Sequence, residues 1–157
     1  MPDAAPAITL RPARREDVAA IVRLLADDAL GAQRDQVSDP PSAAYLDAFD
    51  KITANPRALL AVAEDEAGAV IGTLQLTFIA GLSNQGAELA LVSAVRVDSA
   101  LRGRGLGERM MAWAMDEARA RGCRQMELLS HASRADAHRF YERLGFAKTH
   151  VGMKRTL

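Results

Sequence analysis

Three alternating glycines, set between a β-branched run and a helical pattern, constrain this 157-residue chain more than any other feature. Residues 95–109 read VRVDSALRGRGLGER, which places glycine at positions 103, 105 and 107. Glycine lets the backbone turn sharply and approach a ligand with no Cβ in the way, and the first N–H groups of a helix have no intrahelical acceptor. The pattern therefore predicts a strand, an anion-binding turn and a helix, in that order.

Two familiar phosphate-binding motifs do not fit this turn. A dinucleotide-binding turn has a third glycine three residues after the second, where this chain has Glu108. A P-loop continues with lysine and then serine or threonine, whereas Gly107 is followed by Glu108 and Arg109. The spacing that does fit is Arg102-x-x-Gly105-x-Gly107. It resembles the Arg/Gln-x-x-Gly-x-Gly/Ala pyrophosphate loop of the GNAT superfamily of N-acetyltransferases.

A second motif strengthens the resemblance. Residues 137–146 read AHRFYERLGF, which is similar to the superfamily's C-terminal helix with its tyrosine and its Leu-Gly-Phe ending. Trp113, the run DAHRFY at 136–141 and the ending around 149–150 resemble bacterial aminoalkylphosphonate N-acetyltransferases and their uncharacterised relatives. Because similar helices do not carry a substrate with them, the resemblance implies the cofactor and the reaction, and a phosphonate is one candidate acceptor.

The order of local patterns indicates a mixed sheet. Helices are expected where apolar residues recur at helical spacing, and strands where β-branched runs are bounded by turn residues. The result is an α/β (α+β) fold with a central mixed sheet and helices on both faces, which is also the element order of the GNAT acyl-CoA N-acyltransferase fold. The expected strands are 8–12, 58–64, 69–79, 88–97, 124–129 and a final pair in 146–156, and the expected helices are 15–28 (stopped by Gly31), 43–52, 105–121 (capped by Gly122) and 134–143.

Length and composition agree with a single domain over residues 1–157, with residues 1–6 frayed. Lys plus Arg and Asp plus Glu are both 20, so no overall field attracts nucleic acid or an anionic membrane. No apolar run approaches the roughly 20 residues of a membrane span, and the start lacks the regions of a signal peptide. We therefore expect a cytoplasmic protein with neither nucleic acid nor a membrane as partner. The resemblance implies a small-molecule amine as its substrate, and a homodimer is one oligomeric state that it allows.

Cysteine and histidine are too sparse for a disulfide or a metal site. Cys123 is the single cysteine, and His131, His138 and His150 are too dispersed for a ligand pair. We expect no bound metal.

The resemblance implies that the chain uses acetyl-CoA as a cosubstrate. The glycine turn and the helix start would hold the pyrophosphate. The strands around 95–97 and 124–129 would splay apart, leaving backbone groups to pair with the pantetheine amides. Arg102 and Arg104 either reach phosphate oxygens or remain solvated on the turn. The implied cofactor-binding residues are Val95, Val97, Arg102, Gly103, Arg104, Gly105, Leu106, Gly107, Glu108, Ala137 and Tyr141.

Tyr141 resembles the tyrosine that meets the departing CoA sulfur. With ordinary pKa values of about 10 for a phenol and about 8.5 for a thiol, full proton transfer to the thiolate is uphill by about 2 kcal/mol. A charge-assisted hydrogen bond to the developing thiolate is therefore the larger expected role. The alternative is an aromatic packing residue at a helix end, which is the expected role of Phe140 beside it.

The attacking amine must lose a proton, and the usual base is missing. An alkylamine with a pKa of about 10.4 is neutral in about one molecule in 2,500 at pH 7, a deficit of about 4.6 kcal/mol. The resemblance places the family's glutamate at Ser93, which could position a water in a proton chain. The alternative bases are Glu88, lower on the same strand, and His131, with an ordinary pKa of about 6.5.

Two classes of function fit these residues. The first is an acetyl-CoA-dependent N-acetyltransferase that acts on a primary amine of a small molecule by direct attack, with Tyr141 and Ser93 as catalytic residues. The second is a catalytically weak CoA-binding regulatory module that kept the turn and lost the base. A protein lysine or N-terminal acetyltransferase differs from the first class only in its substrate. The acceptor-side segments 31–42 and 81–86 carry no recognisable pattern, whereas Tyr141 favours an enzyme.

Overall fold

The computed structural model describes residues 7–157, so the expectation for residues 1–6 lies outside it. The described residues form two compact units, divided between Glu127 and Leu128. The second unit contains the last residue of β5 and the helix α6 (Ala135–Arg143). The first unit contains β1 (Ile8–Pro12), the 3-10 helix η1 (Arg15–Asp17), α1 (Val18–Ala26), α2 (Gly31–Arg34), α3 (Ala43–Thr53), β2 (Ala58–Asp65), β3 (Val70–Ile79), α4 (Ser83–Gly86), β4 (Leu89–Val97), the 3-10 helix η2 (Ser99–Leu101), α5 (Leu106–Ala120) and most of β5 (Gln125–Leu128).

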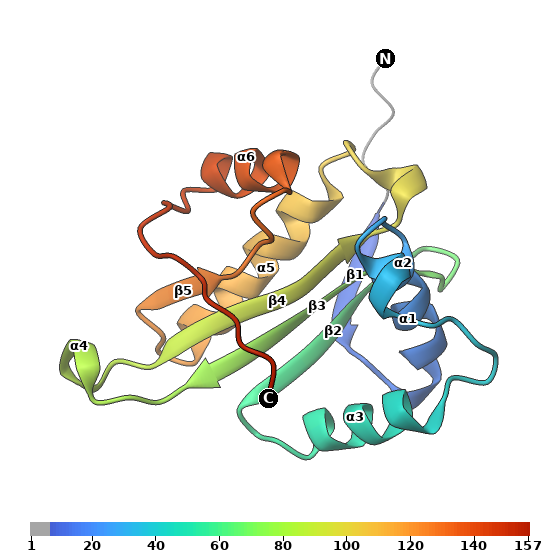
Figure 1. The fold of residues 1–157 in the computed structure, drawn as a ribbon, viewed down its shortest axis with the longest axis horizontal. Coiled ribbons are helices and arrows are strands. Elements are labelled where there is room, and N and C mark those ends of the chain that lie inside the picture. The colour runs from blue at the N-terminus through green and yellow to red at the C-terminus, as the bar shows by residue number, and fades with distance from the viewer. Residues whose placement is uncertain (1–6) are drawn as a thin grey trace. The chain divides into compact units, whose positions relative to one another are not determined.

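The strands form one sheet in the order β1-β2-β3-β4-β5 (Figure 1). β1 to β4 are an antiparallel meander, in which, for example, Thr77 of β3 pairs with Leu91 of β4. β5 begins beside β4, where the Arg124 N–H donates to the Glu88 carbonyl at 3.4 Å. Because α5 returns the chain to the end of the sheet at which β4 begins, β5 runs parallel to β4. The sheet is therefore mixed, as predicted.

Side chains alternate along β3 between two helical layers. On one face, Gly72 lies so close to α5 that an added Cβ would stand 2.7 Å from the Met110 sulfur. On the other face, the buried Thr73 lines a cavity together with Val22 of α1 and Phe49 of α3. Helices therefore cover both faces of the sheet, which confirms the predicted fold class.

The face covered by α5 holds the most deeply buried side chains. Leu74, Leu76 and Phe78 of β3 are at most 2% exposed, and Leu106 and Met110 of α5 are at most 1% exposed. Burial of one side chain of this size stabilises the fold by about 1.5–3 kcal/mol. Since Leu106 is the first residue of α5, its burial also fixes the position of the glycine turn that precedes it.

The first helix ends earlier than predicted. α1 ends at Ala26, and Gly31, predicted to stop it, instead begins α2. Asp28 makes the connecting turn, because its Oδ1 accepts the Gly31 N–H at 2.6 Å and its carbonyl accepts the Ala32 N–H at 2.8 Å. A Cβ on Gly31 would lie 1.9 Å from the Leu25 carbonyl oxygen. Glycine is therefore required here by a close approach of backbone.

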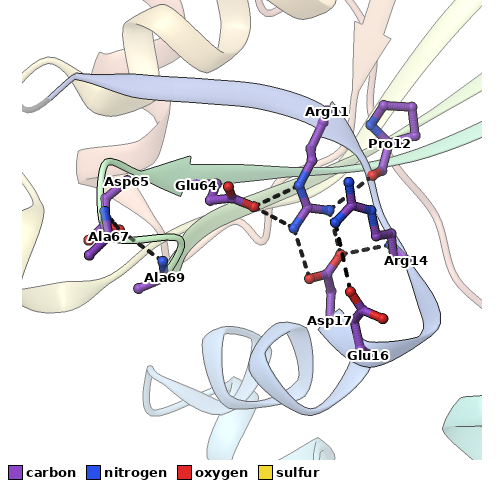
Figure 2. Close-up of polar contacts among 9 residues, drawn as sticks. All are labelled: Arg11, Pro12, Arg14, Glu16, Asp17, Glu64, Asp65, Ala67 and Ala69. Carbon is purple, nitrogen blue, oxygen red and sulfur yellow. Dashed lines mark hydrogen bonds and ion pairs between the residues drawn. The ribbon is translucent and has the colours of Figure 1, made fainter.

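A network of ion pairs joins β1, η1 and β2 (Figure 2). The Arg11 guanidinium donates to Glu64 from Nε at 2.7 Å, and to Asp17 from Nη1 at 2.7 Å and from Nη2 at 3.1 Å. The Arg14 N–H donates to the same Asp17 carboxylate at 2.7 Å. Burial alone would raise the pKa of Asp17, but the hydrogen bonds from Arg11 and Arg14 outweigh it and hold that pKa below its ordinary value.

The turn between β2 and β3 lies where the sequence predicts it. Asp65 Oδ1 accepts the N–H groups of Ala67 at 3.0 Å and Ala69 at 2.8 Å, as Figure 2 shows. Gly68 takes a left-handed φ of +83°. An aspartate that binds the backbone two residues on, followed by a left-handed glycine, is a common way to join two strands.

Three predicted helices correspond to α3, α5 and α6 within one residue at each end. Gly122 closes α5 as predicted, with φ +81° and the following Cys123 N–H bonded to the Ala118 carbonyl at 3.0 Å.

The predicted strand pair in 146–156 is wrong, because the structure assigns no strand to residues 146–157. Val151, Met153 and Leu157 are at least 88% exposed, so the apolar residues after position 150 bury no apolar face. Without that burial, nothing offsets the conformational entropy lost in fixing two strands.

Candidate functional site

The glycine turn enters α5 through backbone conformations that favour glycine. Gly103 has a φ of +78° and Gly105 a φ of +76°, both in the left-handed region. Within the described part of the chain, no atom lies within 4 Å of a Cβ built on either residue. The turn therefore faces open space that a ligand can occupy.

The first turn of α5 leaves backbone donors available to such a ligand. The Arg109 N–H donates to the Gly105 carbonyl at 3.2 Å, and no side chain caps this helix end. The N–H groups of Leu106, Gly107 and Glu108 therefore precede the helical hydrogen-bond ladder. Together with the positive end of the helix dipole, these donors are suited to an anion, and the binding of one here stays a prediction.

α1 holds the turn in place through Asp27, a residue that sequence reasoning missed. Asp27 Oδ2 accepts the Ser99 N–H at 3.0 Å, and its carbonyl accepts Arg102 Nη2 at 3.1 Å. Arg102 Nε also donates to the Val97 carbonyl at 3.2 Å. In this structure Arg102 thus binds the turn to β4 and α1. No local sequence signal pairs Asp27 with a loop 72 residues later.

The end of β4 carries the two valines of the predicted cofactor site. Val95 and Val97 are both half-buried, and Val97 pairs with Gly72. The Val95 carbonyl accepts Arg96 Nη1 at 2.9 Å, and the Val97 carbonyl accepts Arg102 Nε. Pairing of this strand with the pantetheine amides stays a prediction.

A bulge interrupts β4 next to Ser93. Gln75 pairs with Ser93, but the next pair along joins Thr73 to Arg96, so β4 contains one extra residue here. Ala94 absorbs it with a φ of +52°, a conformation that costs a non-glycine residue on the order of 1–3 kcal/mol. Strain of this kind concentrates at functional positions, and the role of the neighbouring Ser93 at the reacting centre stays a prediction.

The two alternative bases belong to different units of the chain. Glu88 comes five positions before Ser93, about 16 Å away along an extended strand. Its carboxylate forms an ion pair with Arg57. His131 belongs to the second unit, where its Nδ1 accepts the Ser133 N–H at 3.2 Å. Ser93 itself is exposed, which suits a residue that positions water.

The second unit carries the last two predicted cofactor residues, both on α6. The Tyr141 ring meets Phe140 at 5.1 Å and Phe146 at 5.9 Å between centroids, each in an edge-to-face arrangement. The Tyr141 carbonyl accepts the Phe146 N–H at 3.0 Å. Ala137 is half-buried one turn earlier. Aromatic packing thus fixes the ring of Tyr141, and its part in the chemistry stays a prediction.

Metal-ligand clusters and membrane-spanning helices are both absent from residues 7–157. They contain no group of three or more His, Cys, Asp or Glu side chains arranged to hold a metal ion. None of their helices combines the length and the apolar character needed to cross a bilayer.

The fold and the site together define a class of protein. A family model described as the acetyltransferase (GNAT) family matches residues 18–146, a range that includes the bulged β4, the glycine turn and α6. The chain therefore belongs to the GNAT family of acetyltransferases, enzymes that transfer an acetyl group from acetyl-CoA to an amine.

Solved structures agree with this assignment. The chain is 38% identical to a transcriptional regulator from Bacillus halodurans C-125, with a TM-score of 0.92 over 96% of this chain and 100% of that one. It shares its fold with a predicted acetyltransferase from Clostridium acetobutylicum whose structure includes acetyl-CoA, at 18% identity, a TM-score of 0.72 and 96% coverage of both chains.

A curated relative resembles a shorter part of the chain. It is an aminoalkylphosphonate N-acetyltransferase from Salmonella typhimurium, 40% identical over 57 residues. The match spans 36% of this chain and 37% of that protein, so it covers little more than a third of the relative's length.

Proposed function

We propose that this protein transfers an acetyl group from acetyl-CoA to a primary amine of a small molecule by direct attack. One observation carries the proposal: α5 begins with uncapped N–H groups after two left-handed glycines, in the turn that follows β4 and η2. The acetyl-CoA found with the Clostridium acetobutylicum relative supports the same choice of ligand. The proposal includes a cytoplasmic location and a homodimer. Analytical sedimentation would measure the oligomeric state.

The glycine turn suits a pyrophosphate. The amides of residues 103–108 would donate to its oxygens, and each favourable anion contact at a helix N-terminus is worth about 0.3–2 kcal/mol. Arg102 would stabilise the turn through its bonds to Asp27 and Val97, so that the donors stay aligned before the ligand arrives.

The chemical step needs a neutral amine and a stabilised leaving group. With Ser93 at the bulge, the amine would pass its proton through an ordered water to solvent. The amine nitrogen then attacks the thioester carbonyl, the C–N bond forms, and the C–S bond breaks as CoA leaves. Tyr141 would donate a hydrogen bond to the sulfur as negative charge develops on it.

Thermal unfolding with and without acetyl-CoA tests the binding half of the proposal. Ligand at about 100 times its dissociation constant should add about 2.7 kcal/mol to the free energy of unfolding. Release of free thiol with a panel of amines then tests the chemical half. The absence of any thermal shift at millimolar acetyl-CoA would contradict the assignment of the site.

A CoA-binding regulatory module is the second candidate. Two observations favour it: position 93 carries a serine, and the Bacillus halodurans relative bears the name of a transcriptional regulator. Tight acetyl-CoA binding without turnover of any amine would support this candidate. A lysine peptide in the same panel tests acetylation of proteins, since that activity differs only in its acceptor.

A further inference from the structure

A cavity of about 140 Å³ lies between α1, α3 and the sheet, on the face opposite α5. Its walls are mainly apolar and come from α1, α3 and the strands β2, β3 and β4. They include Val22 and Leu25 of α1, Phe49 and Ile52 of α3, and Leu60 of β2. No charged side chain lines it within the described part of the chain.

The few polar side chains in the lining are already bonded, with one exception. Thr73 Oγ1 donates to the Ala61 carbonyl at 2.9 Å, and the Tyr45 hydroxyl donates to Asp35 at 3.1 Å. Gln75 is half-buried, and its amide has no hydrogen-bond partner among residues 7–157. One amide is therefore available to a molecule in the cavity.

Gln75 also connects the cavity to the proposed reacting centre. It pairs with Ser93 across the β3–β4 ladder, and opposite residues of an antiparallel pair have Cβ atoms about 4.5–5.5 Å apart on the same face of the sheet. The strained Ala94, which follows Ser93, lines the cavity as well. The cavity therefore lies beside the strand position at which the acceptor amine would react.

We propose that this cavity receives the apolar tail of the acceptor, so that the substrates are primary amines bearing one phenyl or branched alkyl group. The inference rests on the proposed transferase activity. Gln75 and Ser93 hold the amino group, and the tail packs between α1 and α3. A cavity of about 150 Å³ with apolar walls is large enough for benzene, which sets the size of the tail.

The same lining disfavours an acidic tail. A phosphonate or a carboxylate in this cavity would lose its hydration without gaining a cationic partner. The Arg96 guanidinium, on the residue that pairs with Thr73, already has two partners: its Nη1 donates to the Val95 carbonyl at 2.9 Å, and its Nε lies 3.7 Å from Asp28 Oδ2, an ion pair beyond hydrogen-bond distance. An aminoalkylphosphonate is thus a poor fit to this site.

Acetylation of four amines tests the inference. 2-Phenylethylamine and 3-methylbutylamine carry the predicted tails, whereas ethanolamine and aminomethylphosphonate do not. Each buried methylene is worth about a fourfold change in affinity, so kcat/KM for the first two should exceed that for the others by at least tenfold. Equal rates, or a preference for the phosphonate, would overturn the inference while leaving the transferase activity standing.

A matched pair of α3 variants locates the tail. Ala48 lines the cavity and Ala44, one turn earlier, does not, although both are exposed. Ala48→Phe should lower the ratio of kcat/KM for 2-phenylethylamine over ethanolamine by at least tenfold, and Ala44→Phe should leave that ratio within twofold. Ala48→Leu serves if the larger substitution unfolds the protein. An unchanged ratio in a folded Ala48 variant would overturn the inference.

Failure of the transferase activity gives a separate result. If no amine is acetylated, the proposed function fails, and calorimetric binding of 2-phenylethylamine to the CoA-loaded protein tests the cavity directly. Binding that the Ala48 variant removes supports an apolar-amine site. The absence of binding overturns it.

Discussion

Gly105 and Gly122 lie at the two ends of α5 in the same backbone conformation, with φ +76° and +81° and no atom near an added Cβ in the described structure. Alanine at either position should cost about 1–2 kcal/mol of stability through left-handed strain. Gly105→Ala should also weaken acetyl-CoA binding by about tenfold or more, because its methyl group enters the space of the anion. Calorimetric titration with acetyl-CoA measures this difference.

Gly122→Ala is the matched control for that experiment, since it carries the strain and leaves the anion site untouched. Equal acetyl-CoA affinity in the two variants would show that the cofactor does not bind at the start of α5.

Tyr141→Phe should lower kcat by about tenfold to a hundredfold, since a hydrogen bond to a charged group is worth about 1.5–3 kcal/mol. The dissociation constant for acetyl-CoA should stay nearly unchanged, because this bond forms mainly in the transition state. The ring contacts with Phe140 and Phe146 survive the change. Full activity in the variant would reassign Tyr141 to packing alone.

Ser93→Glu should restore the family's base. In the natural protein, the rate should climb with pH toward the pKa of the amine, because solvent takes the proton. The variant should shift this rising limb to lower pH and increase the rate at pH 7, as read from kcat/KM against pH. If the rate of the unsubstituted protein already rises between pH 6 and 7, and His131→Ala or Glu88→Gln removes that rise, the substituted residue would be identified as the base.

Single residues can be predicted from the sequence where a short-range pattern encodes their conformation. The left-handed glycines follow from the spacing of residues 103–107, and φ angles confirm Gly103 and Gly105. Asp27 and the bulge at Ala94 were not foreseen, because both arise from pairing between distant segments. The apolar cavity was not predicted for the same reason, since its walls come from α1, α3 and three strands.

At the scale of elements, some glycines are required by close packing and not by a left-handed φ, and Gly31 is one of them. Its Cβ position lies 1.9 Å from the Leu25 carbonyl oxygen, so Gly31→Ala should cost about 2–3 kcal/mol by forcing α1 and α2 apart. Gly81→Ala is the control: its φ is not left-handed, and the nearest atom to its Cβ is Ser83 Oγ at 4.0 Å. That change should stay within about 0.5 kcal/mol. Urea unfolding measures both, and equal effects would contradict this account of Gly31.

Elements with strong periodicity or clear turn chemistry were predicted well. β2, β3 and α5 lie within one residue of their predicted bounds, since Asp65–Gly68 and Gly122 end them chemically. The strand pair in 146–156 failed because apolar residues in a sequence do not show whether a face exists to bury them.

At the scale of the whole molecule, the Arg11–Asp17–Glu64 network should govern acid stability. The pKa of Asp17 is lower in the folded state than in the unfolded chain, so its contribution is present above about pH 4 and lost as the pH falls through the folded value. Asp17→Asn should therefore lower the free energy of unfolding by about 2 kcal/mol at pH 7. This is less than the usual cost of breaking a buried ion pair, because Arg11 still has Glu64 as an ionic partner.

Urea unfolding of both proteins at pH 7, 5 and 3 checks this prediction. The difference in the free energy of unfolding should be full at pH 7 and 5 and should shrink at pH 3. A difference that stays constant down to pH 3 would mean that the Asp17 charge contributes nothing to stability.

α1 has a further consequence for how the two substrates communicate. Asp27, just beyond its last turn, bonds the glycine turn, while Val22 and Leu25 form a wall of the cavity. A nine-residue helix is short and stiff, so a displacement at one end reaches the other. If both proposed ligands bind, any effect of one on the affinity of the other would be matched by an equal effect in the opposite direction, because such coupling is reciprocal.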